Sequence, residues 1–214
     1  MKQVVRKSKP TATPRRTQAE RRAGTQQSIL TAALETLVEF GHAGFTTTRI
    51  AAKAGVSRGA QENYFPTRTA LLAAATAHAM DEAAARATET AARASHSADP
   101  LKAFLDEEGA FFFSVTYAAM VELALAGRSD PALRKIHRDA FDTIGRSRDR
   151  AWTQALIAAG YDATRVRDLL TMTVTVFRGV ALSAVILPPQ AGAKRAAALW
   201  REQAAPLLGP RRKK

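Results

Sequence analysis

Apolar residues recur at steps of three and four along most of the chain, which is the spacing of one face of an α-helix. The first such stripe begins after Thr17 and consists of Ile29, Leu30, Ala33, Leu34, Leu37, Val38 and Phe40. Gly41 and Gly44 interrupt it, and a glycine commonly ends a helix. Thr46 or Thr47 can then cap a new helix with its hydroxyl. We therefore predict a long first helix that stops at the glycine pair.

Two short helices are predicted next, over residues 47–54 and 58–64. They are separated by Gly55, Val56 and Ser57. Glycine permits the left-handed backbone of a tight turn, the valine fills the junction, and the serine hydroxyl caps the second helix. Two helices joined in this way form a helix-turn-helix motif.

The rest of the chain continues the helical pattern. Pro66 interrupts the helical pattern, and Thr67 caps the next helix. Asp130-Pro131 begins a further helix, because proline is well tolerated just after a cap. The further helices are predicted over residues 68–94, 101–126, 131–159, 163–187 and 193–207.

One stretch in this part has the pattern of a strand. TMTVTVF, residues 171–177, alternates with period two and is rich in β-branched residues. A lone strand cannot pair its backbone hydrogen-bonding groups, and the sequence has no second convincing strand. We therefore predict a helix here as well, and an all-α fold.

Charge is distributed unevenly along the 214 residues, which carry a formal net charge of +13. Residues 1–68 hold 12 Lys and Arg against 4 Asp and Glu, and the final RRKK adds four cations. Residues 69–210 are nearly balanced, with 16 against 15. Such segregation is typical of a protein that binds a polyanion, although solvated tails have the same composition. The absence of cysteine excludes disulfides, thiol catalysis and thiolate zinc sites.

The pentapeptide GVSRG, residues 55–59, also fits the G-x-S-x-G pattern of a serine hydrolase, with Ser57 as the nucleophile. In such hydrolases the nucleophilic serine follows a strand and precedes a helix. Here the preceding IAAKA is helical in pattern, and scattered histidines offer no triad. A helix cap is therefore the preferred role of Ser57, and a hydrolase remains a remote alternative.

Residues 23–75 resemble the N-terminal domain of tetracycline-repressor (TetR) family regulators. The similarity lies in the long first helix, the glycine pair before a Thr-rich cap, the A-x-x-x-G-V-S turn, and the Phe-Pro-Thr-Arg start of a long connecting helix. VELALAGRSDPALR, residues 121–134, is similar to a segment common in one branch of that family. The resemblance implies an all-α homodimer, in which a three-helix bundle with a helix-turn-helix is joined by a long helix to a C-terminal helical domain. That domain would bind a small effector and pair through its last two long helices.

The expected organisation rests on this resemblance. It comprises a flexible basic arm (1–16), a helix-turn-helix domain (17–66), an effector-binding and dimerisation domain (67–208) and a basic tail (209–214). The implied function is sequence-specific transcriptional regulation, by a repressor that a small hydrophobic effector releases from a palindromic operator. An architectural or nonspecific DNA-binding protein without effector is the alternative. We expect no cofactor and a cytoplasmic location.

The helix over residues 58–64 is the expected recognition helix, whose N-terminal residues meet base edges in the major groove. Its expected base-contacting residues are Arg58 for guanine, Ala60 for a thymine methyl, Glu62 for the cytosine amine and Asn63 for adenine, with Gly59 allowing close approach. The residues expected at phosphates are Thr47, Thr48, Tyr64 and Arg68. The basic arm could lie along the adjacent minor groove or backbone.

Aromatic and methionine side chains are concentrated in the C-terminal part. Most such residues serve a core, but a helical bundle can leave an apolar pocket among them. The lining residues we expect are Phe112, Tyr117, Met120, Trp152 and Met172. No metal effector is expected, because His42, His78, His96 and His137 form no ligand-like cluster. The longest apolar stretch, 166–187, is interrupted by charged residues that include Asp168 and Arg178, so no membrane span is expected.

Overall fold

The structure is a computed structural model that describes residues 17–187 and 191–211. Within them every regular element is a helix, which confirms the all-α prediction. The predicted basic arm and the last three residues of the tail lie outside the described part. The helices are α1 (Gln18–Gly44), α2 (Thr47–Ala54), α3 (Arg58–Tyr64), α4 (Arg68–Ala94), α5 (Pro100–Phe112), α6 (Val115–Ala126), α7 (Pro131–Ala158), α8 (Ala163–Ile186) and α9 (Ala191–Leu208).

Side-chain caps begin most of these helices where the sequence predicts them. The Thr17 hydroxyl accepts from the Glu20 N–H at 3.2 Å while the Glu20 carboxylate accepts from the Thr17 N–H at 2.8 Å, a complete capping box. Thr67 caps α4. Asp130 accepts from two backbone N–H groups, and Pro131 follows it in the first turn of α7. These helix starts are therefore local properties of the sequence.

Helix α1 and the α5–α6 segment each contain a break. Gly41 has φ 63°, so the backbone of α1 leaves the helical conformation there although the helix is assigned to Gly44. The single helix expected over residues 101–126 is two helices that meet at 51°. At the bend the Ser114 hydroxyl donates to the Phe111 carbonyl and accepts from the Tyr117 N–H. One side chain thus ends α5 and starts α6, which the apolar periodicity concealed.

The period-two stretch TMTVTVF lies within α8, as predicted. The hydroxyls of Thr171 and Thr175 donate to carbonyls four residues earlier, at 2.9 and 2.8 Å. Thr173 is buried and accepts from the indole N–H of Trp200 on α9 at 3.0 Å. The alternating threonines therefore satisfy their hydroxyls within a helix and against its neighbour.

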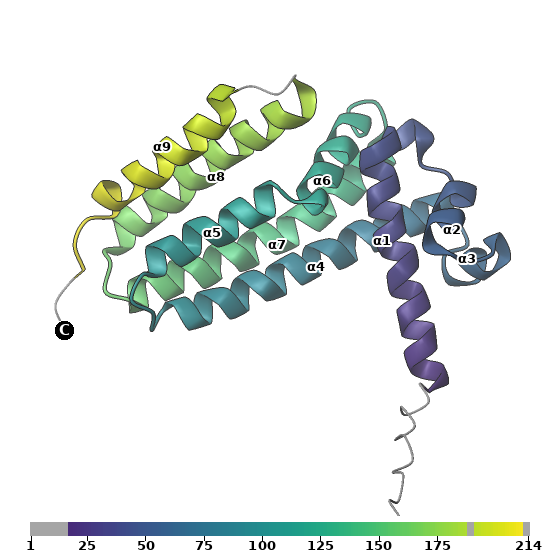
Figure 1. Ribbon diagram of the computed structural model, residues 1–214, viewed down its shortest axis with the longest axis horizontal. Helices are drawn as coiled ribbons and strands as arrows, with labels where there is room; N and C mark the ends of the chain where they lie inside the picture. The colour runs from purple at the N-terminus through teal and green to yellow at the C-terminus, as the bar shows by residue number, and fades with distance from the viewer. Residues whose placement is uncertain (1–16, 188–190, 212–214) are drawn as a thin grey trace, which may run out of the picture.

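The helices form two adjoining cores. Figure 1 shows α1, α2 and α3 at one end, α4, α5 and α7 running away from them, and α8 and α9 side by side at the far flank; the packing of α4 on α7 and of α8 on α9 agrees with this arrangement. The first core includes Ile29, Ile50 and Leu71, and the second includes Phe104 and Phe177. Helix α4 contributes to both, so it links the two ends of the molecule.

The helix-turn-helix part packs against the C-terminal part at more than one place. Leu123 of α6 and Leu133 of α7 are buried in the first core together with α1 and α2. Helix α6 packs along α1. The C-terminal part therefore holds the helix-turn-helix through a second contact besides α4.

Among the described helices, none alone has the length and apolar composition to cross a membrane. Only α5 and α6 taken together, as a bent pair, reach that length and composition.

Candidate functional site

The turn between α2 and α3 has the geometry that the sequence predicts. Gly55 adopts φ 69° and ψ 30°, and its N–H donates to the carbonyls of the last turn of α2. The N–H of Val56 donates to the Ala51 carbonyl at 3.0 Å. The Ser57 hydroxyl accepts from the Ala60 N–H at 3.1 Å and so caps α3. A helix, not a strand, precedes Ser57, so the context of a nucleophile elbow is missing.

Helix α3 has one buried and one exposed side. Gln61 is fully buried, and its amide donates to the Phe65 carbonyl at 3.1 Å. The opposite side faces solvent. On it Arg58, Gly59, Glu62 and Asn63 are exposed, and Ala60 and Tyr64 are half-buried. All four residues that we predict to contact bases through a side chain are therefore at least partly accessible on one short helix. The burial of polar Gln61 was not predicted, although its position four residues before Phe65 places both on one side of the helix.

Arg58 and Glu62 form an ion pair with Nε and Oε1 2.8 Å apart. Both side chains remain largely exposed, so the pair adds little to stability, about 0–1 kcal/mol. Its effect is on the local charge, because the carboxylate neutralises the guanidinium on the exposed side of α3. Either group must leave the other before it can contact a base fully.

Replacement of Glu62 by glutamine is expected to change sequence preference more than overall affinity. The carboxylate can accept from the amine of cytosine, whereas the amide also donates and suits adenine. We expect a shift of about 1–3 kcal/mol in the discrimination at one base pair. Binding to duplexes that differ only at that position measures the shift. A uniform tightening on every duplex would contradict it, since that would reflect only the loss of a repulsive charge.

The residues expected at phosphates lie at the start of α2, the end of α3 and the start of α4, and some of them are engaged within the protein. Thr46, not Thr47, caps α2 through its hydroxyl, which leaves Thr47 half-buried and Thr48 exposed beside it. The Tyr64 hydroxyl donates to the Arg22 carbonyl of α1 at 3.3 Å.

Arg68 is exposed, and its guanidinium donates to the carbonyl of His42 and lies 5.8 Å from the Phe45 ring centroid. Burial lowers the pKa of His42, and the charge of Arg68 lowers it further. A neutral His42 therefore adds no repulsion to Arg68.

The five residues expected to line an effector pocket do not all line one hollow. Phe112 and Tyr117 are buried with ring centroids 4.9 Å apart, and Met120 is buried in the same core. Trp152 is also fully buried, but it packs edge-on against Phe104 and lines neither of the two hollows beside Phe112 and Tyr117. Met172 is 44% exposed on α8. Periodicity identified apolar residues here without indicating which side of a helix meets a hollow.

The two hollows differ in size and openness. A small cavity of about 70 Å³ lies among α4, α5, α7 and α8, lined by Met80, Glu108, Phe111, Phe112, Phe141, Gly145, Arg148, Asp149, Val174 and Arg178. A more open, mainly apolar groove of about 490 Å³ lies among α6, α7 and α8, lined by Tyr117, Met120, Val121, Ala124, Leu125, Arg128, His137, Phe141, Arg178 and Leu182. Phe141 and Arg178 line both, so the two hollows are neighbours.

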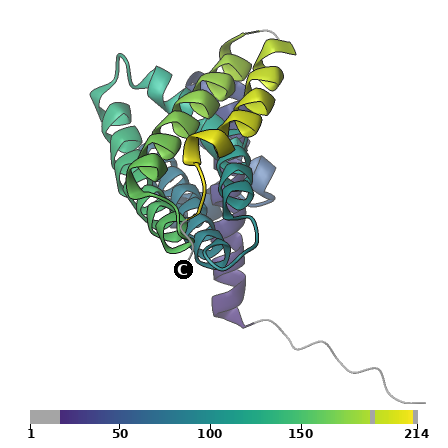
Figure 2. The same cartoon turned by 90° about the vertical axis from the view of Figure 1, so that its left-hand side faces the viewer.

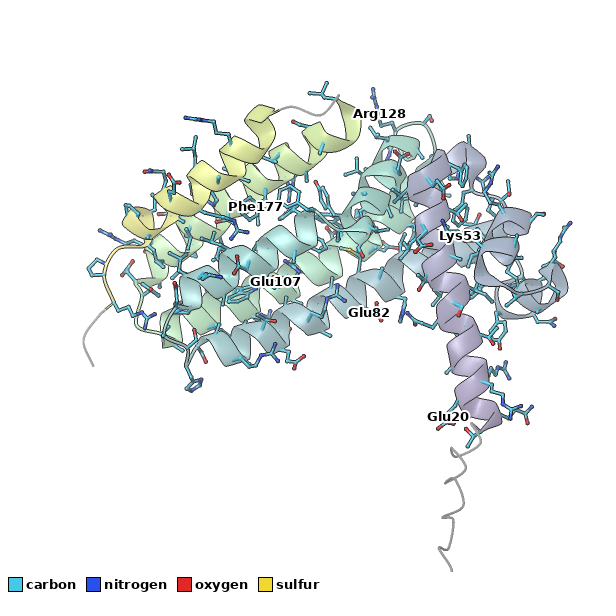
Figure 3. The ribbon with its side chains drawn as sticks, viewed as in Figure 1. Glu20, Lys53, Glu82, Glu107, Arg128 and Phe177 are labelled. Carbon is cyan, nitrogen blue, oxygen red and sulfur yellow. The ribbon has the colours of Figure 1, made fainter. Side chains whose placement is uncertain are left out.

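A buried ion cluster contributes Glu108 and Arg148 to the polar lining of the small cavity. Arg148 on α7 binds Glu107 on α5 with both amino groups, at 2.8 and 2.9 Å, and binds Glu108 at 2.6 Å. The indole N–H of Trp152 donates to Glu107 at 3.1 Å, and the guanidinium of Arg148 stacks over Phe111 at 4.2 Å. Figure 3 shows Glu107 in the middle of the C-terminal part. This cluster was not predicted from the sequence, where two consecutive glutamates in an apolar helix are its only signal.

The cluster has one carboxylate more than its guanidinium can neutralise. Glu107 takes the bidentate contact, and Glu108 shares one amino group of Arg148. Burial raises the pKa of Glu108 to about 7, which Arg148 opposes and Glu107 reinforces. The cavity wall therefore contains a carboxyl group that changes its protonation near neutral pH.

Known proteins share both the sequence and the fold. Residues 29–75 match the family described as bacterial regulatory proteins, tetR family. The chain is 34% identical over 172 residues to the HTH-type transcriptional regulator CymR of Pseudomonas putida, covering 78% of this chain and 83% of that protein.

Solved structures are similar over most of the chain. A TetR-family transcriptional regulator from a Rhodococcus species has a TM-score of 0.65 at 18% identity, covering 87% of this chain and 100% of that one. The multidrug binding protein EbrR, complexed with malachite green, has a TM-score of 0.54 at 23% identity, covering 86% and 98%.

Proposed function

Since this chain belongs to the TetR family of bacterial regulatory proteins, which are transcription regulators and not enzymes, we propose that it represses transcription from a palindromic operator. It binds the operator as a homodimer and leaves it when a small hydrophobic effector binds. The observation that carries this proposal is the exposed side of α3, which presents Arg58, Glu62 and Asn63 beside an accessible Gly59. A helix with this exposed side and a buried opposite side suits insertion into the major groove.

The proposed base contacts follow from the chemistry of these side chains. Arg58 pairs with guanine after its guanidinium turns from Glu62 toward the groove, Asn63 pairs with adenine, and Ala60 meets a thymine methyl. We assign phosphate contacts to Tyr64 at the end of α3, to Thr47 and Thr48 at the start of α2, and to Arg68 at the start of α4. Contacts to phosphates set orientation and carry no sequence information.

The proposed dimer forms through α8 and α9. These helices pair with each other at one flank, and the views in Figures 1 and 2 agree on that position. The exposed large apolar side chains on these helices are Met172, Leu182, Leu199 and Leu207, and Leu187 directly after α8 is also exposed. A four-helix interface with a second copy would remove this apolar surface from water. Met172 suits that interface better than a pocket, because it points to solvent.

The proposed effector site comprises the small cavity and the adjoining groove. Apolar surface comes from Phe141, which lines both hollows, and from the rings of Phe111, Phe112 and Tyr117. The Glu108–Arg148 pair supplies one polar contact point. At about 70 Å³ the cavity is too small for a drug-sized ligand. An effector that reaches from the groove into the cavity must therefore widen the cavity, and displacement of α4 by that widening would move the helix-turn-helix. EbrR, which shares this fold, is a multidrug binding protein, which supports a small-molecule effector here.

Selection of bound duplexes from a random DNA pool tests the proposal. We expect a palindrome whose half-sites lie about one helical turn apart, or a multiple of it, with two chains bound per site. Apolar small molecules that raise the melting temperature of the protein should also release the selected duplex. No preference for any duplex would refute regulation by sequence-specific binding. Specific binding that no stabilising small molecule weakens would instead refute the effector.

A further inference from the structure

We propose that the first three turns of α1 and the end of α3 form a cleft that holds one sugar-phosphate strand of the operator, with Arg21 and Arg22 at its phosphates. The inference rests on the proposed function and adds to it a DNA contact region outside the helix-turn-helix. Four features distinguish this region: an unpacked helix segment, a groove, unpaired cations and continuity with α3.

The first feature is the length of α1 beyond the core. Ile29 is its first buried residue, and residues 18–28 before it are exposed except for the half-buried Thr25. At 1.5 Å per residue these eleven positions extend about 16 Å. Figures 1 and 2 both show this end of α1 projecting past the other helices, and Figure 3 places Glu20 at its tip. A short polar helix without packing is marginal in water, yet a full capping box starts it, which favours a partner outside the chain.

The second feature is a groove of about 460 Å³ between this extension and α3. Its lining residues are Gln18, Arg21, Arg22, Thr25, Ala60, Asn63 and Tyr64. The Tyr64 hydroxyl bonds to the Arg22 carbonyl at 3.3 Å, and the Arg22 guanidinium lies 5.8 Å from the Tyr64 ring centroid. These contacts hold the extension beside the end of α3, so the two walls of the groove keep a defined separation.

The third feature is the charge of the groove. None of its lining residues is acidic, and within the described ranges neither Arg21 nor Arg22 pairs with a carboxylate. The nearby Glu20 is used by the Thr17 cap. By contrast, Lys53 and Arg58 of the helix-turn-helix are both paired with glutamates. The groove thus combines two cations that have no carboxylate partner in the described ranges with the side-chain amides of Gln18 and Asn63, and these groups suit phosphate oxygens.

The fourth feature is the position of the groove beside the proposed base-reading side. Ala60 and Asn63 of α3 belong to both surfaces. A duplex that places its major groove on α3 therefore brings one of its two bounding strands toward the α1 extension. An acidic peptide would satisfy the same charges, but that continuity favours DNA.

The salt dependence of binding to the duplex selected by the unsubstituted protein tests this inference. The variant is Arg21→Ala/Arg22→Ala in the full chain, and the control is Arg86→Ala/Arg150→Ala. The control removes two exposed arginines of α4 and α7 and causes the same change in net charge. Alanine favours helix at least as well as arginine, and circular dichroism checks that α-helix content is kept. Arg21→Lys/Arg22→Lys keeps the charges.

We expect the groove variant to lose up to four phosphate contacts per dimer, each worth about 0.9 in the slope of log K against log salt. Raising the salt from 50 to 200 mM weakens both proteins. The factor by which the groove variant weakens should be about 10²-fold smaller than the factor for the unsubstituted protein. The control and the lysine variant should keep the original slope, and all variants should keep the sequence preference. Hydroxyl-radical protection should disappear at two symmetry-related places only.

Equal slopes for the groove and control variants would overturn the inference and leave the groove to another occupant, such as an acidic peptide. A changed sequence preference with an unchanged slope would overturn it too, because the arginines would then contact bases. Failure of the proposed function is a separate result: the unsubstituted protein would select no duplex, before any variant is made.

Discussion

Replacement of Arg148 by alanine is expected to lower the free energy of unfolding by about 3–5 kcal/mol, because it leaves the buried carboxylate of Glu108 and the half-buried carboxylate of Glu107 without their cation. Arg148 is 4% exposed and holds both Glu107 and Glu108. It also packs over Phe111 at 4.2 Å. The alanine variant loses that contact and gains a cavity in addition to the uncompensated charge. Urea denaturation at pH 7.5 and fixed protein concentration measures the loss.

Arg150 provides the matched control, since it lies on the same helix and is exposed. Its replacement by alanine should change stability by no more than about 0.5 kcal/mol. The triple variant Glu107→Gln/Glu108→Gln/Arg148→Met should recover part of the loss, because removal of all three charges together avoids an unpaired one. A loss under about 1 kcal/mol for the Arg148 variant would contradict the burial of this cluster.

The second large effect is a dependence of stability on pH that originates at Glu108. Its pKa is about 7 in the folded protein against 4.5 for the unperturbed group, with burial as the main cause. The folded chain therefore keeps a proton that the unfolded chain releases between these values. The contribution to stability is largest below pH 4.5 and is lost as pH rises through about 7. From pH 5 to pH 8 the loss amounts to about 2–3 kcal/mol at 1.36 kcal/mol per pKa unit.

Comparison of the unsubstituted protein with Glu108→Gln isolates this contribution. Burial lowers the pKa of His42 and His137, so these groups favour folding as pH rises and oppose Glu108 in the same window. Glu107, Arg148 and Asp149 act on Glu108 in both directions. The stability difference between the two proteins should therefore change by about 2–3 kcal/mol in favour of the variant from pH 5 to pH 8. Glu202→Gln, an exposed substitution on α9, should show a constant difference. A constant difference for Glu108→Gln as well would show that its carboxyl stays ionised.

The helix-turn-helix could be predicted in detail because its geometry depends on neighbouring residues. A left-handed glycine at 55 and a hydroxyl at 57 act within a few residues of themselves, so their effect does not require knowledge of the fold. The same holds for the caps at Thr67 and Asp130. Exposure on α3 was partly predictable from helical spacing, but Gln61 is polar and buried, and the Arg58–Glu62 pair depends on rotamers that spacing alone leaves open.

The C-terminal site could not be predicted in this way, because its contacts join residues that are distant in the chain. Arg148 meets Glu107 and Glu108 across about forty positions, and which of many aromatic residues face a hollow depends on how α5, α6, α7 and α8 are rotated. The break at Ser114 was missed for a different reason: its bonds to Phe111 and Tyr117 are local, but apolar periodicity continues across it.

By itself, then, the amino-acid sequence determined the all-α fold, the caps, the tight turn and the family resemblance, since each depends on short-range sterics, hydrogen bonds or helical periodicity. Only the tertiary structure decided which polar groups are buried, where the hollows lie and that α1 extends beside α3, since burial and long-range pairing arise when the helices pack against one another.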